Sequence, residues 1–395
     1  MAFGIYVHIP YCLQRCTYCD FATYEKSQIL PPEEYTKILI QEIRQRAKFA
    51  PTKKLSTIYF GGGTPSLIPA ENIVAVLQEL SSLGFQTGPD TEITIEINPA
   101  TIDPKKMDIY LKHGINRFSV GAQTFSDQLL KSVHREHNSQ QTRDTLDLLQ
   151  SYKVNYSFDI LFALPGQTLD ILKNDLDFVL KYRPHHVSPY CLTVPEGHLL
   201  SKIKLSEDLQ LNMFKEISST LQNAGYEQYE ISNFSRDGFY SKHNSLYWDD
   251  EEYWGIGLSA HSYFKGKSWG IRFWNPNAIS QYETHILKNN SLMFENDITH
   301  HLQVTDFENL QLHQSVTDYC HTSLRRKKGL IKSDFIQKFG NKIFMKIEPI
   351  LAQQVEDGLM LSSTQLDRWY LSSEGILISN QVFSALTFLE GELPS

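Results

Sequence analysis

Three cysteines stand close together near the start of the chain, in the pattern Cys12-x-x-x-Cys16-x-x-Cys19. Thiolates are soft ligands that bind zinc and iron–sulfur clusters. A structural zinc site normally takes four protein ligands. No fourth cysteine lies near these three, and His8 falls within the predicted strand that precedes them. Three thiolates hold a four-iron cluster when the fourth iron takes an outside ligand, so the pattern favours a [4Fe-4S] cluster, with zinc binding as the alternative.

A glycine-rich motif, Gly61-Gly62-Gly63-Thr64-Pro65, follows the second predicted strand. Glycine lets the backbone approach a ligand closely and adopt positive φ. A tight structural turn is the other interpretation of the same residues. Because a cysteine loop follows the neighbouring predicted strand, we favour a ligand-binding loop.

The elements that position these motifs alternate over roughly the first 200 residues. Six β-rich runs are expected at Gly4–Ile9, Ser56–Phe60, Glu92–Ile97, Arg117–Val120, Asn155–Phe162 and His186–Val194. Amphipathic helices are expected between them, at Pro32–Phe49, Ala70–Leu83, Pro104–Lys112, Gln140–Ser151 and Ile171–Lys181. Such alternation is typical of βαβ units and a parallel sheet. Six units are fewer than the eight of a full barrel, so the fold class expected is α/β, a partial (β/α)6 TIM-like barrel.

Polar residues recur where these runs end. In barrel-like folds the functional side chains lie at the carboxyl ends of the strands. The residues at or near those ends are Cys12, Gly62, Glu96, Gln123, Asp159 and Cys191. Any one of them could be a hydrogen-bonded structural group, but the whole series predicts one shared cavity.

Beyond residue 200 the pattern changes. A helix is expected at Glu207–Ala224, followed by an aromatic-rich segment and then a compact helical module with two β-like runs, Gly358–Ser363 and Trp369–Ser373. We therefore expect three parts. They are the partial barrel over residues 1–235, an aromatic-rich extension over 236–295, and a small C-terminal helical, winged-helix-like domain over 296–395.

Composition narrows the function classes. The 395 residues include 37 Lys and Arg against 45 Asp and Glu, a net charge of −8, which argues against a nucleic-acid partner. No apolar run approaches the ~18–20 residues that span a bilayer, so we expect no transmembrane segment. Five sparse cysteines and no recognisable signal peptide favour a reducing, cytoplasmic location. Peripheral membrane contact stays open, as does the choice between monomer and homodimer.

The cysteine pattern, with Tyr18 inside it, resembles the signature of the radical S-adenosylmethionine (SAM) superfamily. Further segments resemble the oxygen-independent coproporphyrinogen III dehydrogenase group over essentially the whole chain. These segments are Tyr6–Cys12, Gly61–Pro65, Glu96–Pro99, Gly121–Phe125 and Leu164–Thr168. The resemblance implies a [4Fe-4S] cluster on Cys12, Cys16 and Cys19. It also implies SAM contacts from Tyr6, Tyr18, Gly62, Gly63, Thr64, Glu96, Gln123, Arg135 and Asp159, with His261 on the same pocket.

Two departures from the dehydrogenase separate this chain from it. Where the dehydrogenase has a further cysteine after the cluster motif, this chain has Phe21, and the first strand starts within ten residues of the N-terminus. Both features match the sister group, the HemW-type heme chaperones. That group also carries the motif His-Asn-x-x-Tyr-Trp, present here as His243–Trp248.

The residues of this hexapeptide suit a tetrapyrrole. A histidine supplies an axial ligand to heme iron, and Tyr and Trp offer flat apolar faces. An aromatic core cluster with a hydrogen-bonded histidine is the alternative. With the resemblance, His243, Tyr247 and Trp248 are predicted heme contacts. The expected function is a heme chaperone that passes heme to an acceptor protein. The alternative is an enzyme that decarboxylates coproporphyrinogen III oxidatively through a 5′-deoxyadenosyl radical, and the choice between carrier and enzyme stays open.

Other candidates are weaker. The basic run Arg325–Lys328 could contact nucleic acid or anionic lipid, but we favour a solvated helix end. The pairs His185–His186 and His300–His301 follow no familiar ligand spacing. Cys320 is expected to be a small buried residue, and Cys191 either lines the barrel or belongs to the core.

Overall fold

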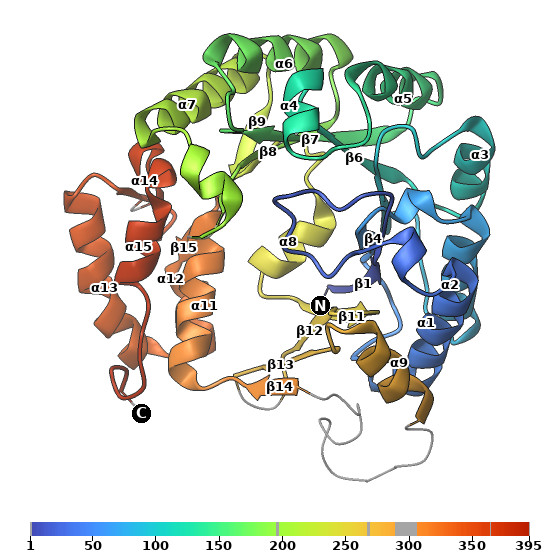
Figure 1. Cartoon of the computed structure of the whole chain (residues 1–395). Helices are drawn as coiled ribbons and strands as arrows, with labels where there is room; N and C mark the ends of the chain where they lie inside the picture. Colours follow the sequence, from blue (N-terminus) through green and yellow to red (C-terminus); the bar gives the residue numbers. More distant parts are fainter. Residues whose placement is uncertain (1, 195–196, 267–268, 289–305, 364, 395) are drawn as a thin grey trace.

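The computed structural model describes residues 2–394 except 195–196, 267–268, 289–305 and 364. A curved sheet occupies the middle of the molecule and the helices of the first 225 residues cover its outer side (Figure 1). The C-terminal helices lie on the open side of the curved sheet, between its two edges, and α8 (Lys242–Trp248) lies on its inner side (Figure 1). Among the described helices none is long and apolar enough to cross a membrane.

In the described part of the chain twelve strands form one sheet, in the order β14-β13-β12-β11-β1-β4-β5-β6-β7-β8-β10-β9. The strands predicted from the sequence are β1 (Phe3–Ile9), β4 (Thr57–Gly62), β5 (Glu92–Ile97), β6 (Arg117–Gln123), β7 (Asn155–Phe162) and β8 (His186–Cys191). Each pairs in parallel with the next. The predicted α/β partial barrel is confirmed, although the sixth strand ends three residues before the expected Val194.

The sequence did not predict that the aromatic-rich segment extends this sheet. β11 (Glu252–Ile256) pairs in parallel with the free side of β1 and becomes a seventh parallel strand. The strands β12 (His261–Phe264), β13 (Ile271–Trp274) and β14 (Asp306–Asn309) follow as antiparallel neighbours. At the opposite edge β9 (Glu227–Glu230) and β10 (Asn233–Ser235) add an antiparallel pair.

The expected outer helices begin and end close to their predicted positions. They are α1 (Pro32–Arg46), α2 (Ala70–Ser82), α3 (Pro104–Lys112), α5 (Ser139–Ser151), α6 (Leu169–Tyr182) and α7 (Glu207–Asn223). The short helix α4 (Asp127–Ser132) was not predicted. Side chains at the N-caps fix several starts, because each accepts a hydrogen bond from an otherwise unpaired backbone amide of the first turn. Asp103, Asn138, Thr168 and Ser206 act in this way.

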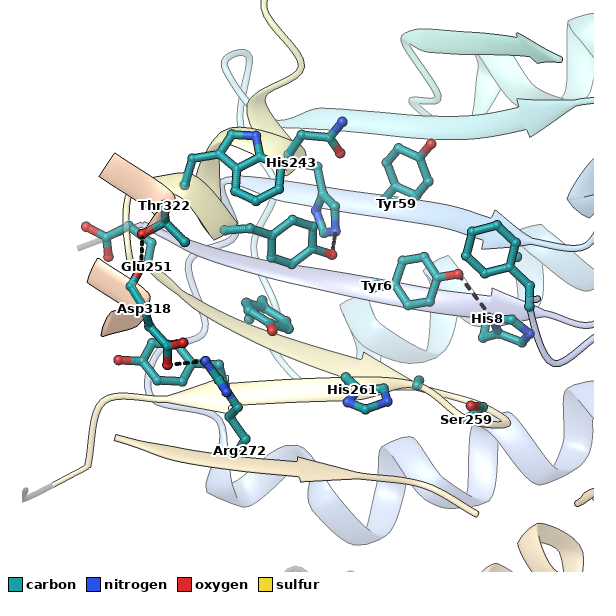
Figure 2. A pocket seen from close by; sticks show the side chains of 18 of the residues that line it. Tyr6, His8, Tyr59, His243, Glu251, Ser259, His261, Arg272, Asp318 and Thr322 are labelled. Atoms are coloured by element: carbon teal, nitrogen blue, oxygen red, sulfur yellow. Dashed lines mark hydrogen bonds and ion pairs between the residues drawn. The ribbon is translucent and has the colours of Figure 1, made fainter. Parts of the chain in front are cut away.

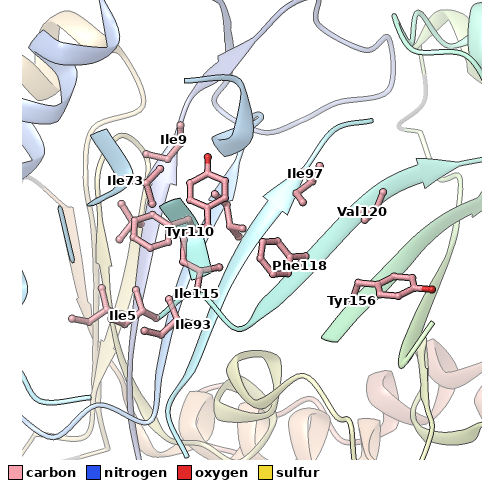
Figure 3. Close-up of a cluster of buried hydrophobic side chains, with 14 of the residues drawn as sticks. Ile5, Ile9, Ile73, Ile93, Ile97, Tyr110, Ile115, Phe118, Val120 and Tyr156 are labelled. Atoms are coloured by element: carbon pink, nitrogen blue, oxygen red, sulfur yellow. The ribbon is translucent and has the colours of Figure 1, made fainter. Parts of the chain in front are cut away.

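Alternation along the strands separates the core from the site. On β5 the side chains of Ile93, Ile95 and Ile97 are buried in the main hydrophobic core, while Glu96 lines the interior of the barrel. Successive side chains of a strand point to opposite faces of the sheet. On each strand, one set of side chains therefore packs against the outer helices, and the other set points into the interior of the barrel. Figure 3 shows part of the core set, with Ile93 and Ile97 of β5, Phe118 of β6 and Tyr110 of α3 in one cluster.

The C-terminal domain has its own core. Its three longer helices are α11 (Leu312–Arg325), α12 (Lys332–Phe339) and α13 (Asn341–Glu356). Its small sheet contains β15 (Leu330–Ile331), β16 (Met360–Ser363) and β17 (Arg368–Leu371). Two short helices, α14 (Ser373–Leu377) and α15 (Ser379–Ala385), follow the last strand. Helices followed by an antiparallel hairpin match the winged-helix-like expectation. Cys320 is fully buried there, as predicted. The expected boundary at 295/296 and the pair His300–His301 lie outside the described residues.

The basic run Arg325–Lys328 joins this domain to the barrel. Arg325 forms an ion pair with Glu230 at 2.8 Å, and Arg326 pairs with Asp249. These partners belong to the barrel edge and the end of α8, so the favoured interpretation as a solvated helix end is wrong for Arg325 and Arg326, whereas Lys327 and Lys328 are exposed as that interpretation expects. Ion pairing across the domain junction explains the cluster of positive charge.

A buried polar network holds the sheet extension to the barrel. The carboxylate of Glu42, on α1, is fully buried and accepts hydrogen bonds from Asn275 (2.8 Å), Tyr282 (2.6 Å) and the backbone amide of Gly257 (2.9 Å). Its charge is balanced by Arg46, one helical turn later. The network therefore fixes the loop between β11 and β12.

We predict that Glu42→Ala lowers the free energy of unfolding by about 3–5 kcal/mol, because it leaves the Arg46 guanidinium buried without its partner. The matched control is Glu79→Ala, which removes the ion pair of Glu79 with the half-exposed Arg44. That change is expected to cost no more than about 1 kcal/mol. Denaturant titration of both variants measures the difference, and equal losses would contradict the role of the network.

Candidate functional site

Two adjoining cavities lie at the carboxyl ends of the parallel strands. The first, the cluster cavity, has a volume of about 450 Å³ and contains the three neighbouring cysteines. The second, the aromatic cavity, has a volume of about 730 Å³ and lies between α8, the strands β11–β13 and α11. The two share part of their lining, namely Phe21, Tyr59, Gly62, Glu96, Tyr190 and Asn244. A molecule in one cavity is therefore a direct neighbour of a molecule in the other.

The thiols follow directly from β1. The short strand β2 (Tyr11–Cys12) pairs with β3 (Tyr24–Glu25) and closes the cysteine loop at its base. Within the loop the amide of Cys19 donates to the carbonyl of Cys16 at 3.2 Å. All three cysteines are free and partly buried. In the described part of the chain no three Cys, His, Asp or Glu side chains are placed for a single metal ion.

The donor set and its surroundings fit an iron–sulfur cluster. The pKa of the Cys12 thiol is raised to about 11, mainly by burial, with the neighbouring cysteines acting in the same direction, so an external cation is needed to hold the thiolate form. The guanidinium of Arg135 donates to Cys16 Sγ at 3.5 Å and to the carbonyl of Gly121 at 2.6 Å. A buried positive charge beside three thiols favours a thiolate-bound cluster.

The glycine motif packs against the start of the cysteine loop. The amide of Gly63 donates to Ile9 at 2.8 Å, and that of Thr64 donates to Tyr11 at 2.7 Å. Gly62 has φ of +112°, and a Cβ there would lie 2.5 Å from the ring of His8. A side chain at position 62 would collide with this ring, so glycine is required there for the backbone to approach His8 closely.

Two buried carboxylates face the same cavity. Glu96 accepts hydrogen bonds from the hydroxyl of Tyr59 (2.7 Å) and the amide of Gly62 (3.0 Å). Its pKa is raised to about 7, mainly by burial, with the nearby Asp159 carboxylate acting in the same direction. Burial also raises the pKa of Asp159, which the positive charge of Arg117 opposes. The cavity therefore offers acidic groups that a cationic ligand would stabilise in their charged form.

Most of the residues that the resemblance assigns to SAM line the cluster cavity. These are Tyr18, Gly62, Gly63, Thr64, Glu96, Gln123, Arg135 and Asp159. Tyr6 and His261 line the aromatic cavity instead. Tyr6 lies with its hydroxyl 3.1 Å from Nδ1 of His8. The SAM contacts themselves stay predictions.

The hexapeptide motif forms the helix α8, with Ser241 as its N-cap. His243 is 1% exposed, and its ring stacks on Tyr59 with centroids 5.1 Å apart. Its Nδ1 lies 2.7 Å from Thr57 Oγ1, and its Nε2 lies 2.9 Å from the hydroxyl of Tyr247. Burial lowers the pKa of His243 to about 3, so the imidazole is neutral. In this arrangement both ring nitrogens already have a partner.

The aromatic residues of α8 reach the aromatic cavity. Tyr247 packs edge-on against Tyr253, with centroids 4.5 Å apart. Trp248 lies under the guanidinium of Arg325, 4.5 Å from the ring centroid, at the junction with the C-terminal domain. On the opposite wall lies His261, and farther along the neighbouring strand lies Arg272, whose guanidinium pairs with Asp318 (Figure 2). The cavity is thus bounded by aromatic rings from several elements.

Sequence reasoning missed some of the lining residues. Arg117, Ser119 and Ser188 line the cluster cavity from the inner faces of the strands, and Tyr190 lines both cavities. The sequence signal that could have identified them was a polar or charged residue at every second position of an otherwise apolar strand.

The structure also shows the environment of Cys191 and of His186. Cys191 packs against the main core, and His186 is buried, 2.8 Å from the hydroxyl of Tyr229.

Comparison with known proteins identifies the family. Residues 6–179 match the radical SAM superfamily. The heme chaperone HemW of Lactococcus lactis is 32% identical over 389 residues, which cover 96% of this chain and 95% of that protein. The chain belongs to the HemW family. Another member of the HemW family, from Bacillus subtilis, is 31% identical over 96% of this chain and 98% of its own length.

A solved structure shares the fold of this HemW-family chain. Coproporphyrinogen III oxidase (HemN) from Escherichia coli, a radical SAM enzyme, superposes with a TM-score of 0.82. The match covers 98% of this chain and 90% of that chain, at 21% sequence identity. The likeness extends through the C-terminal domain and establishes the common architecture.

We predict that Cys12→Ala, Cys16→Ala and Cys19→Ala each abolish a [4Fe-4S] cluster, because two thiolates do not hold it. Iron and sulfide analysis after anaerobic reconstitution measures the cluster content. Cys191→Ala and Cys320→Ala are the controls, since these residues lie in the cores. Unchanged cluster content in Cys16→Ala would refute the ligand assignment.

We also predict that SAM binds more tightly as the pH rises from 6 to 8. With a pKa of about 7, Glu96 is mostly protonated at pH 6 and mostly charged at pH 8, when it attracts the amino group of SAM. The expected gain is about tenfold, measured by calorimetry on the reconstituted protein. Glu96→Gln, which cannot ionise, should bind weakly with no such slope. An equal slope in this variant would assign the titration to another group, such as Asp159.

Proposed function

We propose that this chain is a heme chaperone built on a radical SAM [4Fe-4S] core. It binds heme in the aromatic cavity and passes it to an acceptor protein. The observation that carries the proposal is the position of the aromatic cavity, which shares Tyr59, Gly62 and Glu96 with the cluster cavity. The names of the relatives in this family support the same function.

The first cavity suits the cofactors of the superfamily. Cys12, Cys16 and Cys19 would hold the cluster, and the cluster would supply one electron to SAM when both are bound. The chain's own residues do the positioning: the glycine motif gives close backbone approach, and Glu96 offers a carboxylate to the amino group of SAM. Arg135 places a positive charge beside the thiolates.

The second cavity suits the cargo. Its volume of about 730 Å³ falls within the range of ~300–1,000 Å³ typical of ligand pockets. Tyr59, Tyr247 and Tyr253 supply flat apolar faces with polar edges, which favour a planar macrocycle. Trp248 closes the same wall, near the domain junction. A heme held here could leave toward an acceptor at the junction of barrel and C-terminal domain.

The second candidate is the oxidative decarboxylation of coproporphyrinogen III. The shared fold with HemN and the cavity beside the cluster site favour it. Phe21 argues against this enzyme activity, because it occupies the position where the dehydrogenase carries a further cysteine. This side chain is 64% exposed and lines both cavities, so the position faces the reaction space without a sulfur. We therefore place the carrier function first, in the cytoplasm.

We predict that the anaerobically reconstituted protein binds heme with a Soret shift but does not convert coproporphyrinogen III in the presence of SAM and a reductant. Heme titration and product analysis are run on the same preparation. Heme binding should survive in Cys16→Ala, because the cargo lies in the second cavity. Turnover of coproporphyrinogen III without heme binding would establish the enzyme and reject the chaperone.

A further inference from the structure

Among the described residues, three histidines line the aromatic cavity: His8, His243 and His261. An imidazole ligates iron through a ring nitrogen whose lone pair is free. In His8 the Nδ1 lies 3.1 Å from the hydroxyl of Tyr6, and the Nε2 lies 2.9 Å from the carbonyl of Ala22. Both nitrogens are engaged, so His8 is held in place as part of the wall.

His243 is engaged in the same way. Its two nitrogens contact the hydroxyls of Thr57 and Tyr247, and its backbone amide donates to Glu92 at 3.1 Å. Its ring is almost fully buried between the strands and α8. Iron coordination would break a hydrogen bond in the buried interior and leave a polar atom without a partner, which is unfavourable. This geometry gives His243 a different task, which is to hold the hydroxyl of Tyr247 at the cavity wall.

His261 differs from the other two. Its side chain is exposed, and its ring nitrogens have no hydrogen-bond partner within the part of the chain that the structure describes. The ring is nevertheless oriented, because it stacks on Trp274 with centroids 5.4 Å apart and an interplanar angle of 21°. The loop before it is anchored by the bond from the Gly257 amide to the buried Glu42. An oriented imidazole with free nitrogens is a preorganised metal ligand.

The positive charge nearest to His261 in sheet register is already paired. Arg272 lies opposite Tyr263 on the neighbouring strand, two positions along from Trp274, which is opposite His261. Its guanidinium forms an ion pair with Asp318 of α11 and lies 3.7 Å from a carboxylate oxygen of Glu308, so it ties β13 to the neighbouring elements and is not free for a heme propionate. Of the described residues that line the cavity, Arg272 is the only Lys or Arg.

We propose that His261 supplies the axial nitrogen to the heme iron and that His243 is a positioning residue for Tyr247. This inference rests on the proposed function, since it names the iron ligand of the same cargo. It also places the cargo iron on the wall formed by β12 and β13, away from α8 (Figure 2).

The test is a ferric-heme titration of the full-length protein, followed by absorption and electron paramagnetic resonance spectroscopy. His261→Ala should lose the imidazole-ligand signature and bind heme at least about 10- to 100-fold more weakly. Added imidazole should restore the signature, which a merely structural defect would not allow. His185→Ala is the matched control, since that half-buried ring packs on Phe239 outside both cavities. His243→Gln should keep the wild-type axial signature if its thermal melt shows a folded protein.

Each other outcome decides a separate point. If His261→Ala keeps the wild-type signature and affinity, the assignment is wrong, and loss of the signature in His243→Gln would transfer the ligand role to His243. If the wild-type protein binds no heme at all, the proposed function itself fails.

Discussion

The parallel pairing of β1 on both of its sides is the constraint on which the two cavities depend. Tyr6 pairs with Tyr59 of β4 on one side and with Gly255 of β11 on the other. Parallel strands bring their carboxyl ends to the same edge of a sheet. The cysteine loop after β1, the glycine motif after β4 and the loop that leads to His261 after β11 therefore lie next to one another. Segments about 200 residues apart in sequence become walls of one site.

This arrangement buries several charged side chains, and each of them is stabilised by a partner of opposite charge or by hydrogen bonds. Glu42 and Arg46 compensate each other beneath the β11–β12 loop. Arg117 lies among the carboxylates at the floor of the cavities, with Glu92 at 3.9 Å. Glu92 in turn accepts hydrogen bonds from the backbone amides of Lys242 and His243 at the start of α8. The same ionic groups that stabilise the interior thus also position the helix that carries the hexapeptide motif.

Much of the fold and of the first cavity could be predicted from the sequence, because both depend on local patterns. Apolar alternation marks each strand of the first half, and the cysteine spacing marks the cluster loop. The second cavity depends on contacts between distant segments. The run Glu252–Ile256 is too short and too aromatic to indicate which strand it pairs with.

The roles of the histidines needed the tertiary structure. The spacing of His243 and Tyr247 places them one helical turn apart, but only the packing of α8 on β4 shows that Thr57 occupies the other nitrogen. The sequence likewise could not reveal that Trp274 stacks on His261, since no motif between β12 and β13 indicates the register in which the two strands pair. Basic residues at 325–328 indicated a charged surface, and the acidic partners came from elements far away in sequence.

The central claim is that heme and the iron–sulfur cluster occupy adjoining but separate cavities. A crystal structure of the anaerobically reconstituted, heme-loaded protein, with anomalous scattering recorded at the iron edge, tests it most directly. The account predicts one iron feature enclosed by Cys12, Cys16 and Cys19, and a second in the aromatic cavity beside β12. A heme iron on the outer surface of the barrel, or within the cluster cavity itself, would contradict it.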